Sequence, residues 1–581
     1  MNRRLMSRDF MPQPRTRKIT IIAQDPSVKV KNGRGKRILT AQVDVAAEDL
    51  APGPSGHRVQ IIDYDSSNNT LYKPAKITDG DLYERASDSK LLSDPGFHAQ
   101  NVYAIVMRTL ARFELALGRR VSWGFDGHQI KVAPHAFADA NAFYSEQDRA
   151  LMFGYFQGEE SMVFACLSHD VIAHEATHAL VDGLRQRYTD PSSPEQAAFH
   201  EGFSDVVALL SIFALPAIVE TIIDMGATNK KNAPEMINAS SLTKEKLRGS
   251  ALFGLADEMG QELSGIRGNP LRRSAELPPS KTYIDSPEFM EPHKRGEIFV
   301  AAMMNAFIEV WVNRLKGLGQ QSRGGLDRKR VVEEGANIAE YLLTMSIRAL
   351  DYSPPVDLQF CDFLSALLTA DREMRPDDSR YNFRRTLLKS FESYGLPPAS
   401  NPKSTSAGGE RGLWDPPRVS LTYDRIHFEP MQRDPDEVFR FIWENRKALE
   451  LFEDAYSHVL SVRPCLRIGP DGFALRETVG EYMQMITLTA SELKPLGIKA
   501  PPDMPPETEI TLYGGGALVF DEYGRLKFHI YNRILNADRQ TRRLKYLWDF
   551  GYFQRGSSQF RRFSNLHRQR AMNLPTVMPE G

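Results

Sequence analysis

The stretch SHDVIAHEATHALVDGLRQRYTDPSSPEQAAFHEGFSD, from Ser168 to Asp205, decides the fold of this chain. Apolar residues recur at three- and four-residue intervals from Val171 to Leu184, which predicts an amphipathic helix. This helix carries an H-E-x-x-H motif, His174-Glu175-Ala176-Thr177-His178. Residues four apart lie one above the other on a helix, so both imidazoles can reach the same metal ion. The pattern therefore predicts a helix that carries two ligands of a zinc ion.

The end of the stretch offers a third ligand. His200-Glu201-Gly202-Phe203-Ser204-Asp205 opens a second predicted helix, in which Glu201 and Asp205 lie four residues apart on one face. We assign Glu201 as the third zinc ligand and Asp205 as the carboxylate that orients a ligand histidine. Two histidines, one glutamate and an open position for water are typical of a catalytic zinc ion. Glu175 is then the general base.

Two alternatives to this zinc site stay open at the level of sequence. His200 is a rival third ligand, but the longer metzincin motif has its third histidine six residues after the second, where this chain has Leu184. An H-E-x-x-H motif also arises by chance on a helix with two surface histidines. The Glu-x-x-x-Asp that follows favours the zinc site over that reading.

Composition places few limits on the function. With 581 residues and a formal net charge of −1, the chain is long enough for several domains and has no global field that favours nucleic acid or an anionic membrane. Three cysteines predict no disulfide framework, and the basic N-terminus lacks the apolar segment of a secretory signal. We therefore expect a cytoplasmic protein, although non-classical export as an effector stays open. The apolar run 206–219 is too short to span a bilayer and predicts a buried helix.

Residue patterns predict an α+β fold. Residues 18–30 and 37–73 alternate apolar and polar side chains, as antiparallel strands do, and 97–117 predicts a helix ended by Gly118. Further predicted strands precede the zinc helix, at 129–132, 140–144 and 151–156. The chain after Pro216 is predicted to be mostly helical, with helices at 296–316, 327–350, 357–372 and 379–394.

Residues 397–412 are rich in Pro, Ser and Gly and predict a linker before a separate small α+β unit at 413–581. In this unit we expect a helix over 434–462 and a hairpin over 509–530. Three glycines at 514–516 favour a strand bulge over a phosphate loop, because no Lys-Ser/Thr follows. The basic, aromatic segment from 539 to 570 is interpreted as solvated or paired within the chain, with a nucleic acid or an acidic protein as the less favoured partner.

Several pieces in order resemble the thermolysin family of gluzincin metallopeptidases. They are Asn141-Ala142-Phe143, the segment from Asp170 to Ala179 with its HExxH motif, Glu201-Gly-Phe-Ser-Asp205, Leu271-Arg272 and His293 before a helix. The similarity covers roughly Lys18 to Tyr394. It implies a β-rich N-terminal lobe with the zinc helix (18–200) and a helical second lobe (201–396), between a basic tail (1–17) and the linker. The unit at 413–581 resembles no part of the family and stays an accessory domain of unknown role.

The resemblance also implies roles in substrate binding. Asn141 and the Ala142 backbone resemble the edge strand to which an extended peptide adds. Arg272 resembles the arginine that binds a substrate carbonyl and supports the specificity pocket. A surface ion pair is the alternative role for Arg272.

Further residues resemble the family's catalytic groups. Tyr188 resembles a tyrosine that stabilises the oxyanion, His293 the histidine that shares this task, and Glu288 the acid that orients the histidine. Tyr188 lies one residue closer to the zinc helix than in the family, and a loop aromatic is its alternative role. A cap for the helix that begins near Gly296 is the alternative role for His293.

The resemblance implies a zinc-dependent metallopeptidase with one catalytic ion and a peptide or protein substrate, and we expect an endopeptidase. An aminopeptidase, another metallohydrolase and a non-catalytic zinc-containing binding protein are the alternatives. Asp170 matches a residue that binds structural calcium in the family, but the downstream acids are replaced by an apolar run around Ile212, so calcium is not expected. A membrane partner is not expected either, whereas 413–581 offers a surface for a protein partner.

Overall fold

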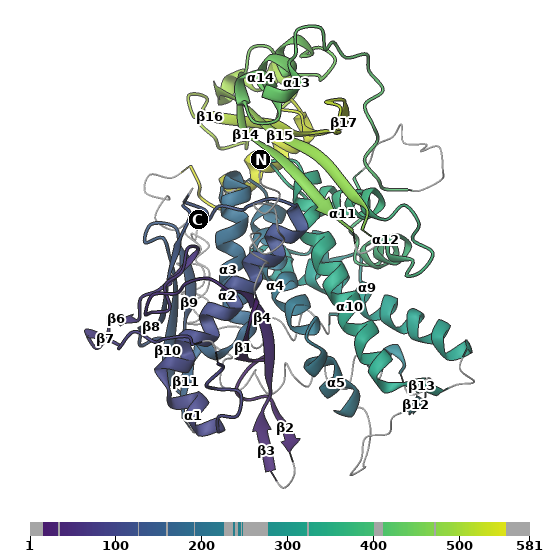
Figure 1. The fold of residues 1–581 in the computed structure, drawn as a ribbon. Coiled ribbons are helices and arrows are strands. Elements are labelled where there is room, and N and C mark those ends of the chain that lie inside the picture. The colour runs from purple at the N-terminus through teal and green to yellow at the C-terminus, as the bar shows by residue number, and fades with distance from the viewer. Residues whose placement is uncertain are drawn as a thin grey trace, which may run out of the picture.

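The computed structural model contains both helices and strands, an α+β architecture (Figure 1). It describes residues 16–553 except 33–34, 79, 126, 159–160, 191, 226–235, 239–241, 246, 248–276, 322–324, 400–410 and 470–471. The strands of the first half lie on one side of a group of long helices. The sheet formed within residues 456–532 covers one end of these helices (Figure 1).

The N-terminal strands pair locally. Strands β1 (Thr16–Ile22) and β4 (Thr40–Ala46) are antiparallel, with Thr16 opposite Ala46. Their alternating apolar residues, such as Ile19 and Val43, are buried against helix α2, which is why the alternating pattern predicted these strands correctly. Two short hairpins complete the region, formed by β2 (Lys29–Asn32) with β3 (Gly35–Ile38) and by β6 (Tyr64–Asp65) with β7 (Thr70–Leu71).

A five-stranded sheet lies beside the zinc helix. Its strands run in the order β11–β10–β8–β5, and β9 pairs with β10. The expectation of antiparallel strands over 37–73 was wrong for β5, which pairs in parallel with β8. Strands β8 and β10 are also parallel. Parallel neighbours need long crossover connections, and helix α2 supplies the connection between β5 and β8. The bounds of these strands are β5 (Val59–Ile61), β8 (Ile130–Phe137), β9 (Ala142–Ser145), β10 (Ala150–Gln157) and β11 (Met162–Phe164).

Helix α2 (Pro95–Leu117) has its expected end at Gly118, which adopts the left-handed conformation with φ 67°. A Cβ at Gly118 would lie 2.2 Å from the carbonyl oxygen of Leu466, so this glycine also lets a C-terminal strand approach the helix end. The short helix α1 (Asp88–Ser93) precedes α2. Helix α2 packs against the zinc helix α3 (His169–Leu184) and joins the two sides of the core.

The apolar run 206–219 forms two helices instead of the one predicted. Helix α4 (Pro194–Phe213) and helix α5 (Pro216–Met225) meet at an angle of 78°. Pro216 lacks the N–H that a continuous helix would need, and it begins α5 instead. The buried location expected for this run is confirmed, because Val206, Leu210 and Ile218 belong to the main core.

The remaining helices of the central region lie close to their predicted positions. They are α9 (Pro292–Gln321), α10 (Arg328–Ala349), α11 (Phe360–Met374) and α12 (Phe383–Ser393), with a small β12 (Met236–Asn238) and β13 (Gly325–Asp327) pair beside them. Among the described helices, Pro292–Leu318 is long and apolar enough by itself to cross a membrane, and so is the bent pair α4 and α5 taken together. The apolar window of Pro292–Leu318 is 83% buried inside the protein, as in the core helix of a globular fold.

The residues after 412 form a four-stranded antiparallel sheet in the order β14–β15–β16–β17. The strands are β14 (Tyr456–Ile468), β15 (Ala474–Thr489), β16 (Glu509–Phe520) and β17 (Leu526–Asn532), and the helices are α13 (Phe428–Met431), α14 (Pro435–Glu444) and α15 (Ala537–Asp549). The hairpin over 509–530 is confirmed, with Gly524 at φ 81° in its turn. Gly514 lies within β16, and a Cβ there would lie 2.5 Å from the backbone nitrogen of Ile534.

The helix predicted over 434–462 was wrong beyond its first ten residues. Helix α14 ends at Glu444, and residues from Tyr456 onward form strand β14. The segment Tyr456–Ile468 pairs along its length with β15, the next strand of the chain, so hydrogen bonds to that strand replace those of a helix. Local periodicity alone could not reveal that partner.

The C-terminal sheet is packed against the central helices. Its residues Val519, Phe528 and Ile530 belong to the main hydrophobic core, together with Tyr352 after α10. The backbone N–H of Leu466 donates to the carbonyl of Gly118 at 3.0 Å, and the fully buried Arg185 after α3 pairs with Glu481 of β15. Residues 413–553 thus contact both the end of α2 and the end of the zinc helix. The linker at 397–412 lies largely outside the described residues.

Candidate metal centre and active site

The zinc helix α3 is enclosed by the core along its whole length. All 16 of its residues are buried. Apolar residues such as Val171 and Leu180 pack into the core and fix the rotation of the helix. His174 and His178 therefore project to one side, and their ring centroids lie 4.4 Å apart.

Glu201 reaches the two histidines from helix α4. This helix begins with Ser193, whose side chain accepts a hydrogen bond from the N–H of Gln196, and with Pro194 at its first position. The Nε2 atom of His174 lies 3.5 Å from Oε2 of Glu201, and that of His178 lies 3.7 Å from Oε1. The ligating atoms of all three residues lie within 4.8 Å of one another, and the residues are buried.

These separations fit a zinc ion. Ligand atoms about 2.0–2.1 Å from zinc at tetrahedral angles lie about 3.4 Å from each other. The observed 3.5 and 3.7 Å are close to this value. Two imidazoles and a carboxylate are also the donor set of catalytic zinc sites. His174, His178 and Glu201 are therefore the residues that would hold the ion.

Further contacts orient both histidines from behind. The Nδ1 atom of His174 lies 2.7 Å from a carboxylate oxygen of Asp205, one turn after Glu201 on α4. The Nδ1 atom of His178 lies 2.6 Å from Nδ1 of His200, and the two rings are stacked. His200, the rival third ligand, thus contacts a ligand and orients it. The position of His200 directly before Glu201 on α4 could have suggested this contact. The sequence alone does not distinguish a histidine that binds the metal from one that contacts a metal ligand.

Asp205→Ala is expected to weaken zinc binding about 10- to 100-fold, because the carboxylate fixes the ring orientation and tautomer of His174. Competition with a chromophoric chelator measures this affinity. Asp205→Asn is the matched control, since its amide oxygen can still accept from Nδ1, and we expect a smaller loss. Unchanged affinity in Asp205→Ala would remove the orienting role from this residue.

Glu175 lies between the two ligand histidines in sequence and contacts the neighbouring strand. Its side chain is fully buried and accepts a hydrogen bond of 3.0 Å from the backbone N–H of Tyr144 on β9. Among the described strands, β9 pairs only with β10, so its other edge faces α3. The N–H of Ala142, two residues earlier, lies on the same edge and donates to the side chain of Asn141 at 2.9 Å. Asn141 and Ala142 therefore lie at the edge of β9 that faces away from β10.

His293 reaches the same centre from the start of α9. Its Nε2 atom lies 3.7 Å from Oε2 of Glu201, and its Nδ1 atom pairs with Glu291. Glu288, the acid predicted to orient His293, pairs instead with Lys294 at 3.2 Å and has a side chain that is 65% exposed. The prediction for Glu288 is corrected to Glu291. An acid two residues before the histidine is a signal that the sequence contained, but family spacing pointed to the wrong one.

Burial alone would raise the pKa of Glu291, but the charge and hydrogen bond of His293 lower it to about 2. Glu291 is therefore ionised at neutral pH. Its carboxylate also accepts a hydrogen bond from the N–H of Lys294 at 2.9 Å, which holds it at the first turn of the helix. The fixed carboxylate of Glu291 keeps a proton on the adjacent Nδ1 atom of His293, and the Nε2 atom of this ring then points towards Glu201.

Tyr188 does not have the role expected of it. Its hydroxyl donates to the carbonyl of Pro354 at 2.8 Å, and its ring packs edge-on against Phe199. Burial raises its pKa well above the ordinary value. A hydroxyl has one proton to donate, and Pro354 receives it, so Tyr188 is a core residue here and the oxyanion role is corrected.

Arg272 and Asp170 are the remaining residues to which the sequence analysis assigned a role. Arg272 lies outside the described residues. Asp170 is buried in the first turn of α3, where a carboxylate interacts favourably with the helix dipole.

Residues 64–182 match the family model described as thermolysin metallopeptidase, catalytic domain. No match was found among curated proteins. The matched segment contains His174, Glu175 and His178, whereas Glu201 and His293 lie beyond it. The match supports a thermolysin-like zinc metallopeptidase, a hydrolase that acts on peptide or protein substrates.

Proposed function

We propose that this chain is a zinc-dependent endopeptidase. The observation that carries the proposal is the convergence of His174, His178 and Glu201 in one buried group, with Glu175 on the same helix as the two histidines. Most structural zinc sites have four protein ligands, and they need no carboxylate placed beside the ion as a base. Three ligands with an adjacent carboxylate are the arrangement for hydrolysis.

Zinc bound by these residues would polarise the scissile carbonyl and supply a water nucleophile at neutral pH. Glu175 is the proton carrier in this proposal, taking a proton from the water and passing it to the leaving amine. Its contact with the N–H of Tyr144 holds the carboxylate in one orientation. The Nε2 atom of His293 is the proposed donor to the developing oxyanion, with Glu291 holding the ring from the other side.

The substrate is proposed to bind as an added strand at β9. The edge of β9 that faces away from β10 carries the N–H groups of Ala142 and Tyr144, and the latter contacts Glu175 directly. A peptide extended along this edge would pass beside the proposed base. Asn141, at the start of the strand, is the side chain proposed to contact the peptide backbone.

Endopeptidase activity requires cleavage of a peptide that has no free ends. We expect hydrolysis of an internally quenched peptide library with blocked N- and C-termini, loss of activity with a zinc chelator, and recovery on adding zinc. Cleavage only of peptides with a free amino terminus would favour the aminopeptidase alternative. Bound zinc with no cleavage in either library would favour a binding protein. We also propose a reducing, cytoplasmic location, which the three free cysteines support.

A further inference from the structure

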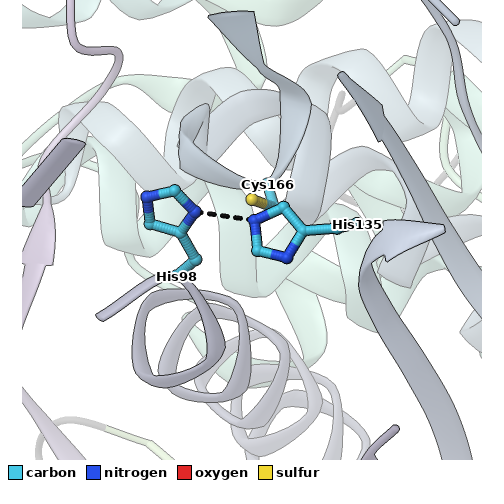
Figure 2. A group of neighbouring side chains, drawn as sticks. All are labelled: His98, His135 and Cys166. Atoms are coloured by element: carbon cyan, nitrogen blue, oxygen red, sulfur yellow. Dashed lines mark hydrogen bonds between the residues drawn. The ribbon is translucent and has the colours of Figure 1, made fainter. Parts of the chain in front are cut away.

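A second group of metal-binding side chains lies outside the candidate active site. It consists of His98 from α2, His135 from β8 and Cys166 from the short 3-10 helix Ala165–Leu167 that precedes α3 (Figure 2). One nitrogen of each histidine and the cysteine sulfur lie within 4.8 Å of one another. All three residues are buried, with at most 1% of each exposed.

Both histidines are hydrogen-bonded on the side away from this group. The Nε2 atom of His98 lies 3.1 Å from the carbonyl oxygen of Leu92, and a carbonyl can only accept, so Nε2 carries a proton. The Nδ1 atom of His135 lies 2.9 and 3.0 Å from the two carboxylate oxygens of Asp63 and donates to them. A carboxylate or backbone carbonyl behind each ring is the usual support for a metal-binding histidine.

The inner nitrogens then face each other. The Nδ1 atom of His98 and the Nε2 atom of His135 are 2.8 Å apart (Figure 2). Because the contact with the Leu92 carbonyl places a proton on Nε2, a neutral His98 ring presents a lone pair at Nδ1. Two nitrogen lone pairs cannot approach this closely unless a positive charge lies between them. A proton and a metal ion are the two candidates.

The charges balance in either case. A proton on His135 Nε2 makes an imidazolium that offsets the Asp63 carboxylate, with Cys166 as a neutral thiol. A zinc ion would displace this proton and the thiol proton, so its charge of +2 is offset by the thiolate and Asp63. Coordination deprotonates a thiol outright. The exchange of two protons for one zinc ion therefore adds no net charge to a buried site.

We propose that His98, His135 and Cys166 form a second zinc site, supported by Asp63 and the Leu92 carbonyl. Thiolate and imidazole are ligands that zinc prefers. The two inner nitrogens would separate from 2.8 Å to about 3.4 Å, a small shift between rings on different elements. A small ligand such as water takes the fourth position. The rings of Tyr72 and Phe164 pack 4.9 Å and 4.8 Å from His135 and His98 and limit solvent.

The proposed site would join three parts of the fold. Helix α2, strand β8 and the segment leading into the zinc helix are brought together at one ion, three residues before α3 begins at His169. Asn101 on α2 already binds the carbonyl of Cys166 at 3.0 Å and holds this segment in place. A zinc ion here would stabilise the junction from which the catalytic helix starts.

Cobalt substitution tests the site, because a thiolate bound to Co²⁺ gives an intense charge-transfer band in the near ultraviolet. His174, His178 and Glu201 include no sulfur, so this band reports only the second site. We expect the full-length protein prepared with cobalt to show the band. The same protein prepared with zinc should contain two equivalents of metal. Cys166→Ala should lose the band and one equivalent.

Two controls separate this inference from the proposed function. Cys361→Ala removes a thiol elsewhere in the protein and should keep the band and both equivalents. Glu201→Ala should lose peptide cleavage and zinc from the first site but keep the band. A wild-type protein with one equivalent of metal and no thiolate band would overturn the proposal and leave a proton-bridged cluster. The wild-type spectrum decides this even if Cys166→Ala fails to fold.

Discussion

Replacing Glu175 with glutamine is expected to reduce peptide hydrolysis by about 10²- to 10⁴-fold, the usual contribution of a general base, while zinc content stays at the wild-type level. Glutamine has nearly the same shape, and its amide oxygen can still accept from the N–H of Tyr144. The loss should therefore appear in kcat, with KM little changed, because the substitution removes a proton acceptor and leaves the binding edge of β9 intact.

Asp182→Asn is the matched control for Glu175→Gln. Asp182 is also a buried acid on α3 and also contacts Tyr144, whose hydroxyl donates to it at 2.9 Å. Asparagine can accept the same hydrogen bond, so we expect activity within a few-fold of the wild type. Measuring kcat, KM and bound zinc for both variants distinguishes the base from a general effect of removing charge from the helix. Undiminished turnover in Glu175→Gln would exclude it as the base.

The zinc helix could be predicted from sequence because its information is local. The spacing of His174 and His178 and the apolar residues around them specify both the helix and the side on which the imidazoles lie. The third ligand could be predicted for a similar reason, since Glu201 and Asp205 are one turn apart on the next helix. The structure brings Glu201 to the two histidines and Asp205 to His174.

Features that depend on contacts between elements could not be predicted in this way. Strand β14 was taken as helix because its hairpin with β15 was not considered, and the contact of Tyr188 with Pro354 joins residues 166 positions apart. The group of His98, His135 and Cys166 comes from three elements with no common spacing motif. Only packing places these side chains together, so the sequence patterns that reveal a helix give no indication of them.

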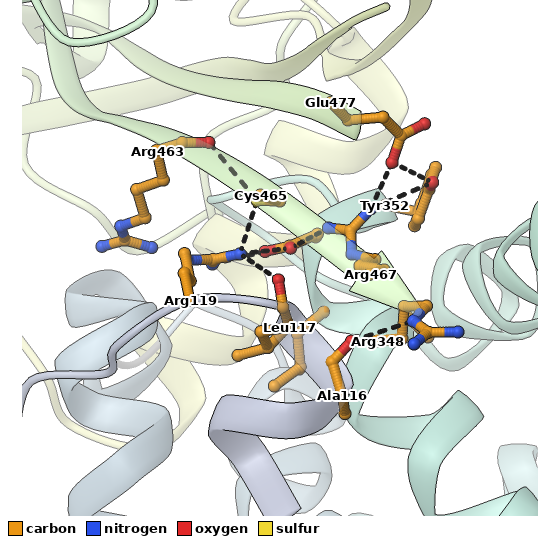
Figure 3. Close-up of polar contacts among 12 residues, drawn as sticks. Ala116, Leu117, Arg119, Arg348, Tyr352, Arg463, Cys465, Arg467 and Glu477 are labelled. Carbon is orange, nitrogen blue, oxygen red and sulfur yellow. Dashed lines mark hydrogen bonds and ion pairs between the residues drawn. The ribbon is translucent and has the colours of Figure 1, made fainter. Parts of the chain in front are cut away.

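A buried ion-pair network also depends on such packing, and it joins the C-terminal sheet to the central helices (Figure 3). Arg467 of β14 is fully buried and pairs with Asp351, after α10, and with Glu477 of β15. Asp351 also accepts two hydrogen bonds of 2.6 and 2.7 Å from Arg119, and Glu477 pairs with Lys527 at 2.7 Å. Arg467 is the central cation that both acids share.

Lowering the pH should weaken this ion-pair network. Burial alone would raise the pKa of Asp351, but Arg119 and then Arg467 lower it well below its usual range. The unfolded chain then binds a proton more readily than the folded one, so Asp351 contributes stability above the ordinary aspartate pKa of about 4. That contribution is lost as the pH falls from about 4 towards the lowered pKa of the folded state.

Arg467→Met is expected to lower the free energy of unfolding by about 3–5 kcal/mol, because the buried carboxylates of Asp351 and Glu477 both lose an ion pair with Arg467. Adding Glu477→Gln should restore part of this loss. In the double variant Asp351 still has Arg119, and Lys527 still pairs with Glu373, so every remaining charge of the network has an opposite partner. Tyr352, which donates to Glu477 at 2.7 Å, can donate to glutamine instead.

The measurement is urea unfolding of the wild type, both single variants and the double variant, from which the coupling between the two sites follows. Arg525→Met is the matched control, since its guanidinium is 69% exposed and pairs with Asp521 at the β16–β17 turn. A surface pair of this kind contributes under about 1 kcal/mol. If Arg467→Met were no more destabilising than Arg525→Met, this network would contribute no more than a surface ion pair to holding the C-terminal sheet. A double variant less stable than Arg467→Met would instead show that Glu477 stabilises the fold through Lys527 more than it repels Asp351.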